Sequence, residues 1–138
     1  MNQETPTWQP VNAIPMIASF IDDMVADTSE QWKTLQPARA KPHVLDSELV
    51  EHIKRAYSGQ LDTSMLFKEQ LSRWQKERLS PDQSNEIARL EGQVATLQAN
   101  LTNILELAHE VKDHTIDKIL EKDDLEIGLE ALLGKHRF

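Results

Sequence analysis

The sequence contains no cysteine, which excludes disulfide bonds, thiolate metal sites and a cysteine nucleophile. It has only four glycines and one tyrosine, too few for a protein of many short strands and tight turns. Its apolar runs are too short to span a membrane, and residues 1–6 lack the basic and apolar regions of a signal peptide. We therefore expect a helical protein that does not enter membranes and resides in the cytoplasm.

The net charge of −8 argues against bulk attraction to nucleic acid or to an anionic membrane surface. One stretch differs, because residues 33–78 carry nine Lys and Arg against six Asp and Glu, an excess of three positive charges. These charges are interleaved rather than clustered, which is typical of a solvated helix face. A nucleic-acid partner is therefore not expected.

The main positive signal is an apolar heptad with alternating spacings of three and four residues. This spacing keeps one side chain per turn on a narrow stripe of an α-helix, as in coiled coils and helical bundles. Its members are Ile87, Leu90, Val94, Leu97, Leu101, Ile104, Ala108 and Val111. The heptad predicts a core made by long helices that lie nearly side by side.

Start signals and prolines divide the chain into elements. Ser80 is followed by proline, aspartate and glutamine, a combination typical of a helix N-terminus at Pro81. We expect an all-α, elongated helical bundle built on a long antiparallel hairpin, with a connection of only two or three residues. Its two helices span about 46–78 and 81–121, with Asp46 or Ser47 capping the first.

Two shorter helices complete the predicted bundle. An N-terminal helix spans about 12–36, with Asn12 as a plausible cap and an apolar stripe. A short C-terminal helix spans about 124–133. Breaks near Asp27 and near Gly59 are open alternatives, and in both places we favour a continuous helix. Residues 1–11 form an extended N-terminal arm and residues 12–138 a single helical domain. The stripe of the N-terminal helix comprises Ile14, Ile17, Phe20, Ile21, Met24 and Val25.

A second stripe on the long helix indicates an oligomer interface. No charge occurs in the fourteen residues between Glu91 and Glu106, where a surface helix normally carries some. Small residues spaced by four, three and four lie away from the heptad, and leucines widen the apolar face further along. We expect a symmetric homodimer in which two hairpins form a four-helix core. The predicted interface residues are Ala88, Gly92, Ala95, Ala99, Leu105 and Leu107.

Acids and histidines provide the candidate metal ligands. Glu106 and His109 have the Glu-x-x-His spacing of di-iron bundles, but the sequence has no second copy. His109 and His114 are five residues apart and point to different sides of a helix. Zinc could still pair His109 with Asp113, or Glu110 with His114. A second acidic group combines Glu48, Glu51 and His52 with Glu121 and Asp124, a pattern also seen in magnesium-dependent all-α hydrolases.

Trp8 lies in a proline-flanked arm, and we expect this arm to dock on the bundle or on a second copy. No catalytic residue and no cofactor is predicted. We interpret the chain as a self-associating scaffold or adaptor that acts through protein–protein contacts. One alternative is a metal-dependent helical enzyme or metal-binding protein that uses the residues near Glu48–His52 and Glu106–His114. Another is a nucleic-acid-associated regulator.

Overall fold

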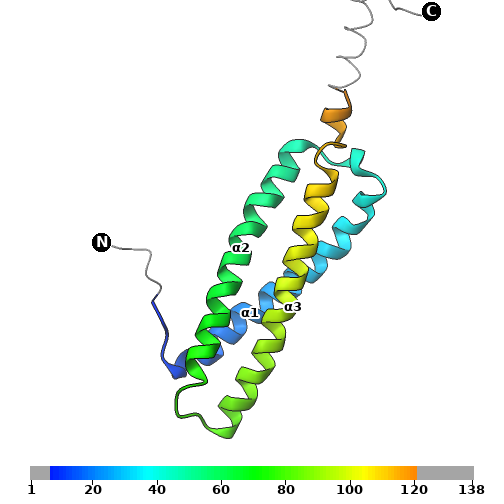
Figure 1. Cartoon of the computed structure of the whole chain (residues 1–138). Coiled ribbons are helices and arrows are strands. Elements are labelled where there is room, and N and C mark those ends of the chain that lie inside the picture. Colours follow the sequence, from blue (N-terminus) through cyan, green and yellow to red (C-terminus); the bar gives the residue numbers. More distant parts are fainter. Residues whose placement is uncertain (1–6, 121–138) are drawn as a thin grey trace, which may run out of the picture.

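The computed structural model describes residues 7–120, which form three long helices (Figure 1). The predicted all-α helical bundle is confirmed, since these residues contain no strand. Within this range, no helix combines the length and the apolar character needed to cross a membrane. The elements are η1 (Val11–Ala13), α1 (Ile14–Leu35), η2 (Gln36–Arg39), η3 (Pro42–Val44), α2 (Ser47–Trp74) and α3 (Pro81–Val111), where η denotes a 3-10 helix.

α3 is the central helix of the bundle. All eight heptad residues from Ile87 to Val111 are at most 3% exposed, so the predicted stripe is confirmed as the core. α1 and α2 each pack along α3, whereas they make only sparse contact with one another. Burying one stripe of α3 under two helices removes far more apolar surface from water than either helix alone could.

A polar layer divides the core into two hydrophobic clusters. The first holds the N-terminal half of α1 and the tip of the α2–α3 hairpin, and the second holds the opposite end of the bundle. Between them lie the fully buried hydroxyl residues Thr28 of α1 and Ser64 of α2. Asn100 of α3 donates to the Thr28 hydroxyl at 3.1 Å, and Gln98 donates to the Ser64 hydroxyl at 3.3 Å. Because these buried polar groups need their partners, they favour one register of the three helices.

Both helices that were in doubt are continuous. The Thr28 hydroxyl donates to the Met24 carbonyl at 2.7 Å, so it closes a turn of α1 instead of capping a new helix. α2 passes Gly59 without a break, and its N-cap Asp46 accepts from the Leu49 N–H at 2.7 Å. α1 begins at Ile14 after a 3-10 turn and has no side-chain cap, so the prediction that Asn12 caps it is wrong.

One residue of the predicted apolar stripe of α1 is exposed to solvent instead of buried in the core. Phe20 is 50% exposed, whereas Ala18 is 6% exposed and takes an inward position. Phe20 follows Ile14 by six residues, which places it roughly 120° away from Ile14 around the helix. The small Ala18 side chain lets α1 approach its neighbours closely.

The hairpin connection is longer than predicted, although α3 begins at Pro81 as expected. The Ser80 hydroxyl accepts from the Gln83 N–H at 3.1 Å, and the Gln83 side chain accepts from the Ser80 N–H at 2.9 Å. α2 ends at Trp74 rather than near residue 78, because a hydrogen-bonded turn follows it. The resulting six-residue connection over 75–80 allows Leu79 to pack against the first cluster.

The prediction that the third helix continues to residue 121 is wrong. α3 ends at Val111, a turn follows, and a new helical turn runs from Ile116 to Leu120 at the end of the described residues. The break is held by contacts with the start of α2. The Ile116 N–H donates to the Leu45 carbonyl at 2.8 Å, and Asp117 accepts from the Ser47 N–H at 2.9 Å. The predicted helix over 124–133 lies outside the described residues.

Replacing a core leucine of α3 should be far more costly than replacing a surface leucine of α2. Leu97 is fully buried, and we expect Leu97→Ala to lower the free energy of unfolding by roughly 3 kcal/mol. The matched Leu66→Ala variant removes a side chain that is 46% exposed and should cost at most about 1 kcal/mol. Urea denaturation followed by circular dichroism measures both. Equal losses would contradict the central position of α3.

Candidate functional site

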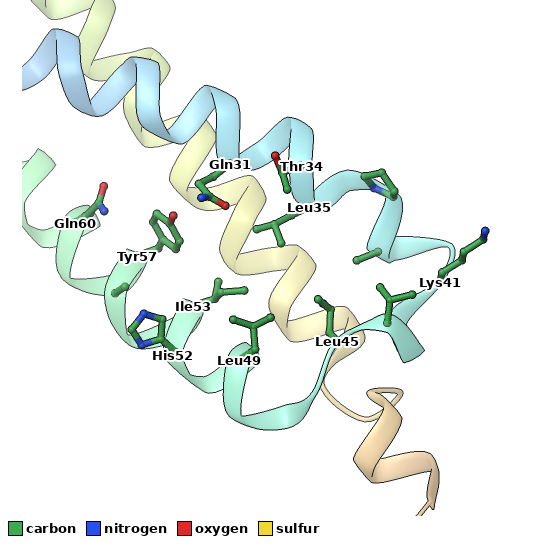
Figure 2. Close-up of a pocket in the computed structure, with 14 residues that line it drawn as sticks. Gln31, Thr34, Leu35, Lys41, Leu45, Leu49, His52, Ile53, Tyr57 and Gln60 are labelled. Atoms are coloured by element: carbon green, nitrogen blue, oxygen red, sulfur yellow. The ribbon is translucent and has the colours of Figure 1, made fainter.

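An apolar groove opens between α1 and α2 at the end of the bundle that holds the second cluster. Because the two helices diverge there, their facing sides are not covered by each other (Figure 1). The groove has a volume of about 530 Å³, and Figure 2 shows its lining side chains pointing between the two helices. Leu35 of α1 and Ile53 of α2 lie deepest, since both are buried and pack in the second cluster against α3.

The chemistry of this groove is apolar with a weakly basic rim. Val44 is 63% exposed and Leu49 is 43% exposed, so large apolar side chains meet solvent at its mouth. Lys41 and His52 are its basic residues, and among the described lining residues none is acidic. Tyr57 closes part of the wall, and burial together with the negative charge of Asp27 raises the pKa of its hydroxyl.

Sequence reasoning missed this groove because several lining residues come from the connection between α1 and α2. Ala38 lies in the proline-bounded segment 37–43 and Val44 and Leu45 directly follow it, and short 3-10 helices fold this connection against the bundle. One signal in the sequence points to it: Val44, Leu45 and Leu49 are apolar, yet they fall outside the buried stripe of α2 that begins with Val50 and Ile53. Residues of this kind indicate a second apolar face.

The predicted interface residues lie in two different environments. Ala88, Gly92, Ala95 and Ala99 are all exposed on the outer face of α3, and a side chain added at Gly92 would meet open space. Leu105 is partly exposed and lines a hollow of about 330 Å³ together with Leu61 of α2. Leu107 is buried against α1 and α2 within the chain's own core. The proposed interface therefore depends on the other five residues.

The charge-free window of α3 is partly explained within the single chain. Gln93 donates to Asp22 of α1 at 2.9 Å, and Asn100 donates to Ser29 of α1 at 2.9 Å. On the other side Gln98 donates to Ser64 of α2. These neutral side chains serve the contacts of α3 with both neighbours. The small residues at the outer face remain without such a role.

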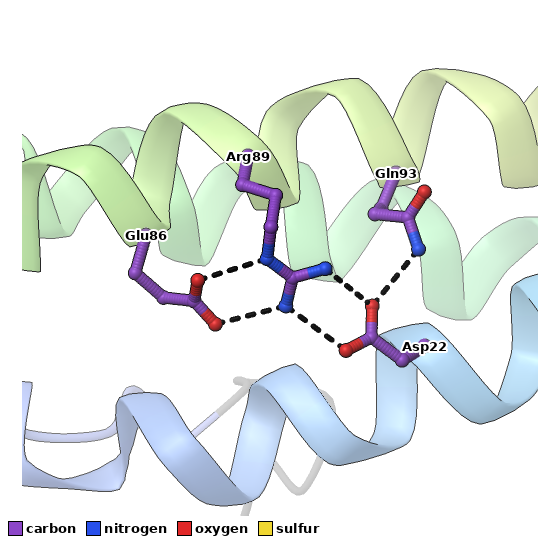
Figure 3. Close-up of polar contacts among 4 residues, drawn as sticks. All are labelled: Asp22, Glu86, Arg89 and Gln93. Atoms are coloured by element: carbon purple, nitrogen blue, oxygen red, sulfur yellow. Dashed lines mark hydrogen bonds and ion pairs between the residues drawn. The ribbon is translucent and has the colours of Figure 1, made fainter.

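A charged cluster joins α1 to α3 near the first hydrophobic cluster. Arg89 is held between two carboxylates, with 2.9 Å from a guanidinium nitrogen to Asp22 and 2.9 Å to Glu86 (Figure 3). Hydrogen bonds from Arg89 lower the pKa of both Asp22 and Glu86, and the two acids raise the pKa of Arg89. Each charge is satisfied by the others, so the cluster fixes α1 on α3 rather than presenting a reactive group.

The candidate metal ligands do not form a metal site in the described part of the chain, although Glu106, His109 and Glu110 line one hollow. Glu106, His109, Glu110, Asp113 and His114 are all exposed. Glu110 is engaged by Arg39 of η2, with 2.8 Å between the Arg39 Nε and Glu110 Oε1 atoms. Among residues 7–120, no group of three or more acidic or histidine side chains is arranged to hold a metal ion.

Two acids of α2 are engaged in local pairs with basic residues of the same helix. Glu51 pairs with Lys54 and Glu69 pairs with Arg73, both within the helix. His52 faces the apolar groove instead of joining Glu48 and Glu51 in an acidic site. Glu121 and Asp124, the remaining members of the predicted acidic group, lie outside the described residues. The exposed pairs add little stability and mark no reaction centre.

The Trp8 arm docks on the side of α2. The guanidinium of Arg73 lies 4.3 Å from the centroid of the Trp8 ring, an arrangement that favours cation–π attraction. The Gln9 backbone is fixed by two side chains: its N–H donates to Gln70 at 2.7 Å, and its carbonyl accepts from the Trp74 indole at 2.9 Å. Through these contacts the arm docks on its own chain.

The Asp117 carboxylate couples the end of the described chain to the start of α2, and its titration tests this contact. Hydrogen bonds from the Ser47 hydroxyl and backbone N–H lower the pKa of Asp117 to about 2. Because the folded pKa is depressed, this contribution to stability is present above the ordinary pKa of 3.8 and is lost as the pH falls through 2.

We expect Ser47→Ala to return the Asp117 pKa toward 3.8 in a carboxyl NMR titration. Removing the hydroxyl removes the largest cause of the lowered pKa, while the Ser47 backbone N–H still donates to this carboxylate. The exposed Ser58→Ala in the same helix is the control and should leave the titration unchanged. An Asp117 pKa unaffected by Ser47→Ala would show that this contact does not form in solution.

Comparisons with protein-family models, curated proteins and solved structures found no match for this chain. The functional proposal is therefore based on the surfaces of the described residues. Two of these are distinctive: the apolar groove between α1 and α2, and the exposed small residues on the outer face of α3.

Proposed function

We propose that this chain is a self-associating interaction protein that pairs with a second copy through the outer face of α3 and the adjoining edge of α2. The single observation that carries the proposal is the exposed row of small residues on α3, most of which lies in the charge-free stretch 92–105. Small residues at positions 88, 92, 95 and 99 allow a neighbouring helix to approach closely, as at other helix interfaces.

Apolar side chains from α2 extend this face. Met65 is 58% exposed, and its sulfur lies 3.4 Å from the side-chain nitrogen of Gln98, beside the small residues of α3. Leu61 and Leu105 line the hollow at the end of the face. Glu106, His109 and Glu110 also line this hollow, so it offers a side chain of the other copy both apolar and polar contacts.

Two-fold symmetry fits this surface because each copy would present the same patch to the other. In the proposed dimer α3 is covered on all sides: α1 and α2 pack on its heptad face, and the partner covers its small residues. The assembled molecule would act as a scaffold or adaptor through protein contacts, with the core of each chain unchanged.

Placing charge in the centre of this surface should dissociate the dimer. We expect the wild-type chain to show twice the mass of 15.8 kDa in light scattering after size-exclusion chromatography. Ala95→Glu combined with Ala99→Glu buries unpaired charges at the interface, each costing about 3 kcal/mol, and should weaken association by at least about 100-fold.

Ala26→Glu is the matched control because Ala26 is exposed on α1, away from this surface. This variant should remain dimeric, and circular dichroism should show the same helix content in all three proteins. A wild-type mass of 15.8 kDa at every concentration would overturn the proposal. An unchanged dimer in the Ala95 and Ala99 variant would place the interface elsewhere.

A further inference from the structure

We propose that residues 124–133 of this chain pack as a fourth helix into the apolar groove between α1 and α2. The groove is large, lined by leucine, valine and isoleucine side chains, and open to solvent in the described part of the chain. Four observations point to this occupant: where the described chain ends, the length of the groove, the apolar pattern of the segment and its charge.

The chain passes the end of the groove at Ile116, shortly before the described residues end. The Ile116 N–H donates to the carbonyl of Leu45, and Leu45 itself lines the groove. From Ile116 the helical turn to Leu120 extends about 7 Å. Residues 121–123 can span about 10 Å when extended, which exceeds the length of that helical turn. The segment is therefore tethered near the groove, which gives it a high effective concentration there.

The segment matches the groove in length and in pattern. Groove residues on α2 run from Leu49 to Gln60, roughly 17 Å along the helix axis, and a helix over 124–133 is about 15 Å long. Apolar residues of the segment recur at i, i+4, i+7 and i+8, which places them on one helical face. These residues are Leu125, Leu129, Leu132 and Leu133.

Charge also favours this occupant. The stretch 121–130 contains five acidic residues and one lysine, whereas the described groove lining contains Lys41 and His52 and no acid. An acidic amphipathic helix would place its leucines on Leu35 and Ile53 and its carboxylates near the basic rim. Val44 and Leu49, which are exposed at the mouth, would then be covered.

Paramagnetic relaxation in the full-length protein tests this packing directly. Because the chain lacks cysteine, Ala131→Cys introduces a single attachment point for a nitroxide spin label. Residue 131 lies opposite the apolar face, so the label does not block docking. We expect loss of amide signals around Leu35, Leu49 and Ile53, with signals of Ala88 and Ala95 on the outer face of α3 retained.

Matched variants in the labelled protein separate specific docking from random contact. Leu129→Glu on the apolar face of the segment should restore the groove signals, as should Leu49→Glu at the exposed groove mouth. Ile127→Glu lies on the opposite face and should not restore the groove signals. Circular dichroism checks that each variant retains its helix content.

A second sample mixes spin-labelled chains at natural nitrogen abundance with nitrogen-15 chains that carry no spin label. It shows whether the signal loss arises within one chain or between two chains. Signal loss only within the same chain supports the proposal. Loss between chains would show that a second copy supplies the helix and would overturn intramolecular docking. Intact groove signals in the labelled chain would overturn the proposal completely. None of these outcomes depends on whether the outer face of α3 forms a dimer.

Discussion

The burial of one apolar stripe on α3 under two other helices is the constraint on which the structure depends. Eight side chains from Ile87 to Val111 are excluded from water, and both hydrophobic clusters are built on them. α1 and α2 are held in place by α3 rather than by each other. The Thr28 and Ser64 hydroxyls, which receive hydrogen bonds from α3, add directional contacts where the apolar clusters are interrupted.

This arrangement explains two open surfaces in the described part of the chain. Since α1 and α2 share a partner without packing closely together, they separate toward one end and leave the groove that includes Leu35 and Ile53. Since two helices cover only part of the circumference of α3, its outer face remains open at Ala95 and Ala99. A fourth helix in the groove and a second copy on the outer face would cover these surfaces independently.

Local patterns predicted much of the fold. The heptad and the Ser80 capping box act through neighbouring residues, so the core of α3 and its first residue could be read from the sequence. The end of α3 could not, because Leu45 and Ser47 hold the following turn from about 70 residues away. The groove was missed for the same reason, as Val44 and Leu45 reach it only after the linker folds back. The five candidate metal ligands near the end of α3 share a segment but not a site.

Native-state hydrogen exchange tests the central position of α3 most directly. If both other helices depend on α3, then the amides of Leu90, Leu97 and Leu101 should exchange only through global unfolding. Their exchange free energies should equal the free energy of unfolding measured by denaturant. Amides on the sides of α1 and α2 that face away from α3 should exchange at lower free energies. Faster exchange in the middle of α3 than in α1 or α2 would contradict the account, because the helix that supports the others cannot open before them.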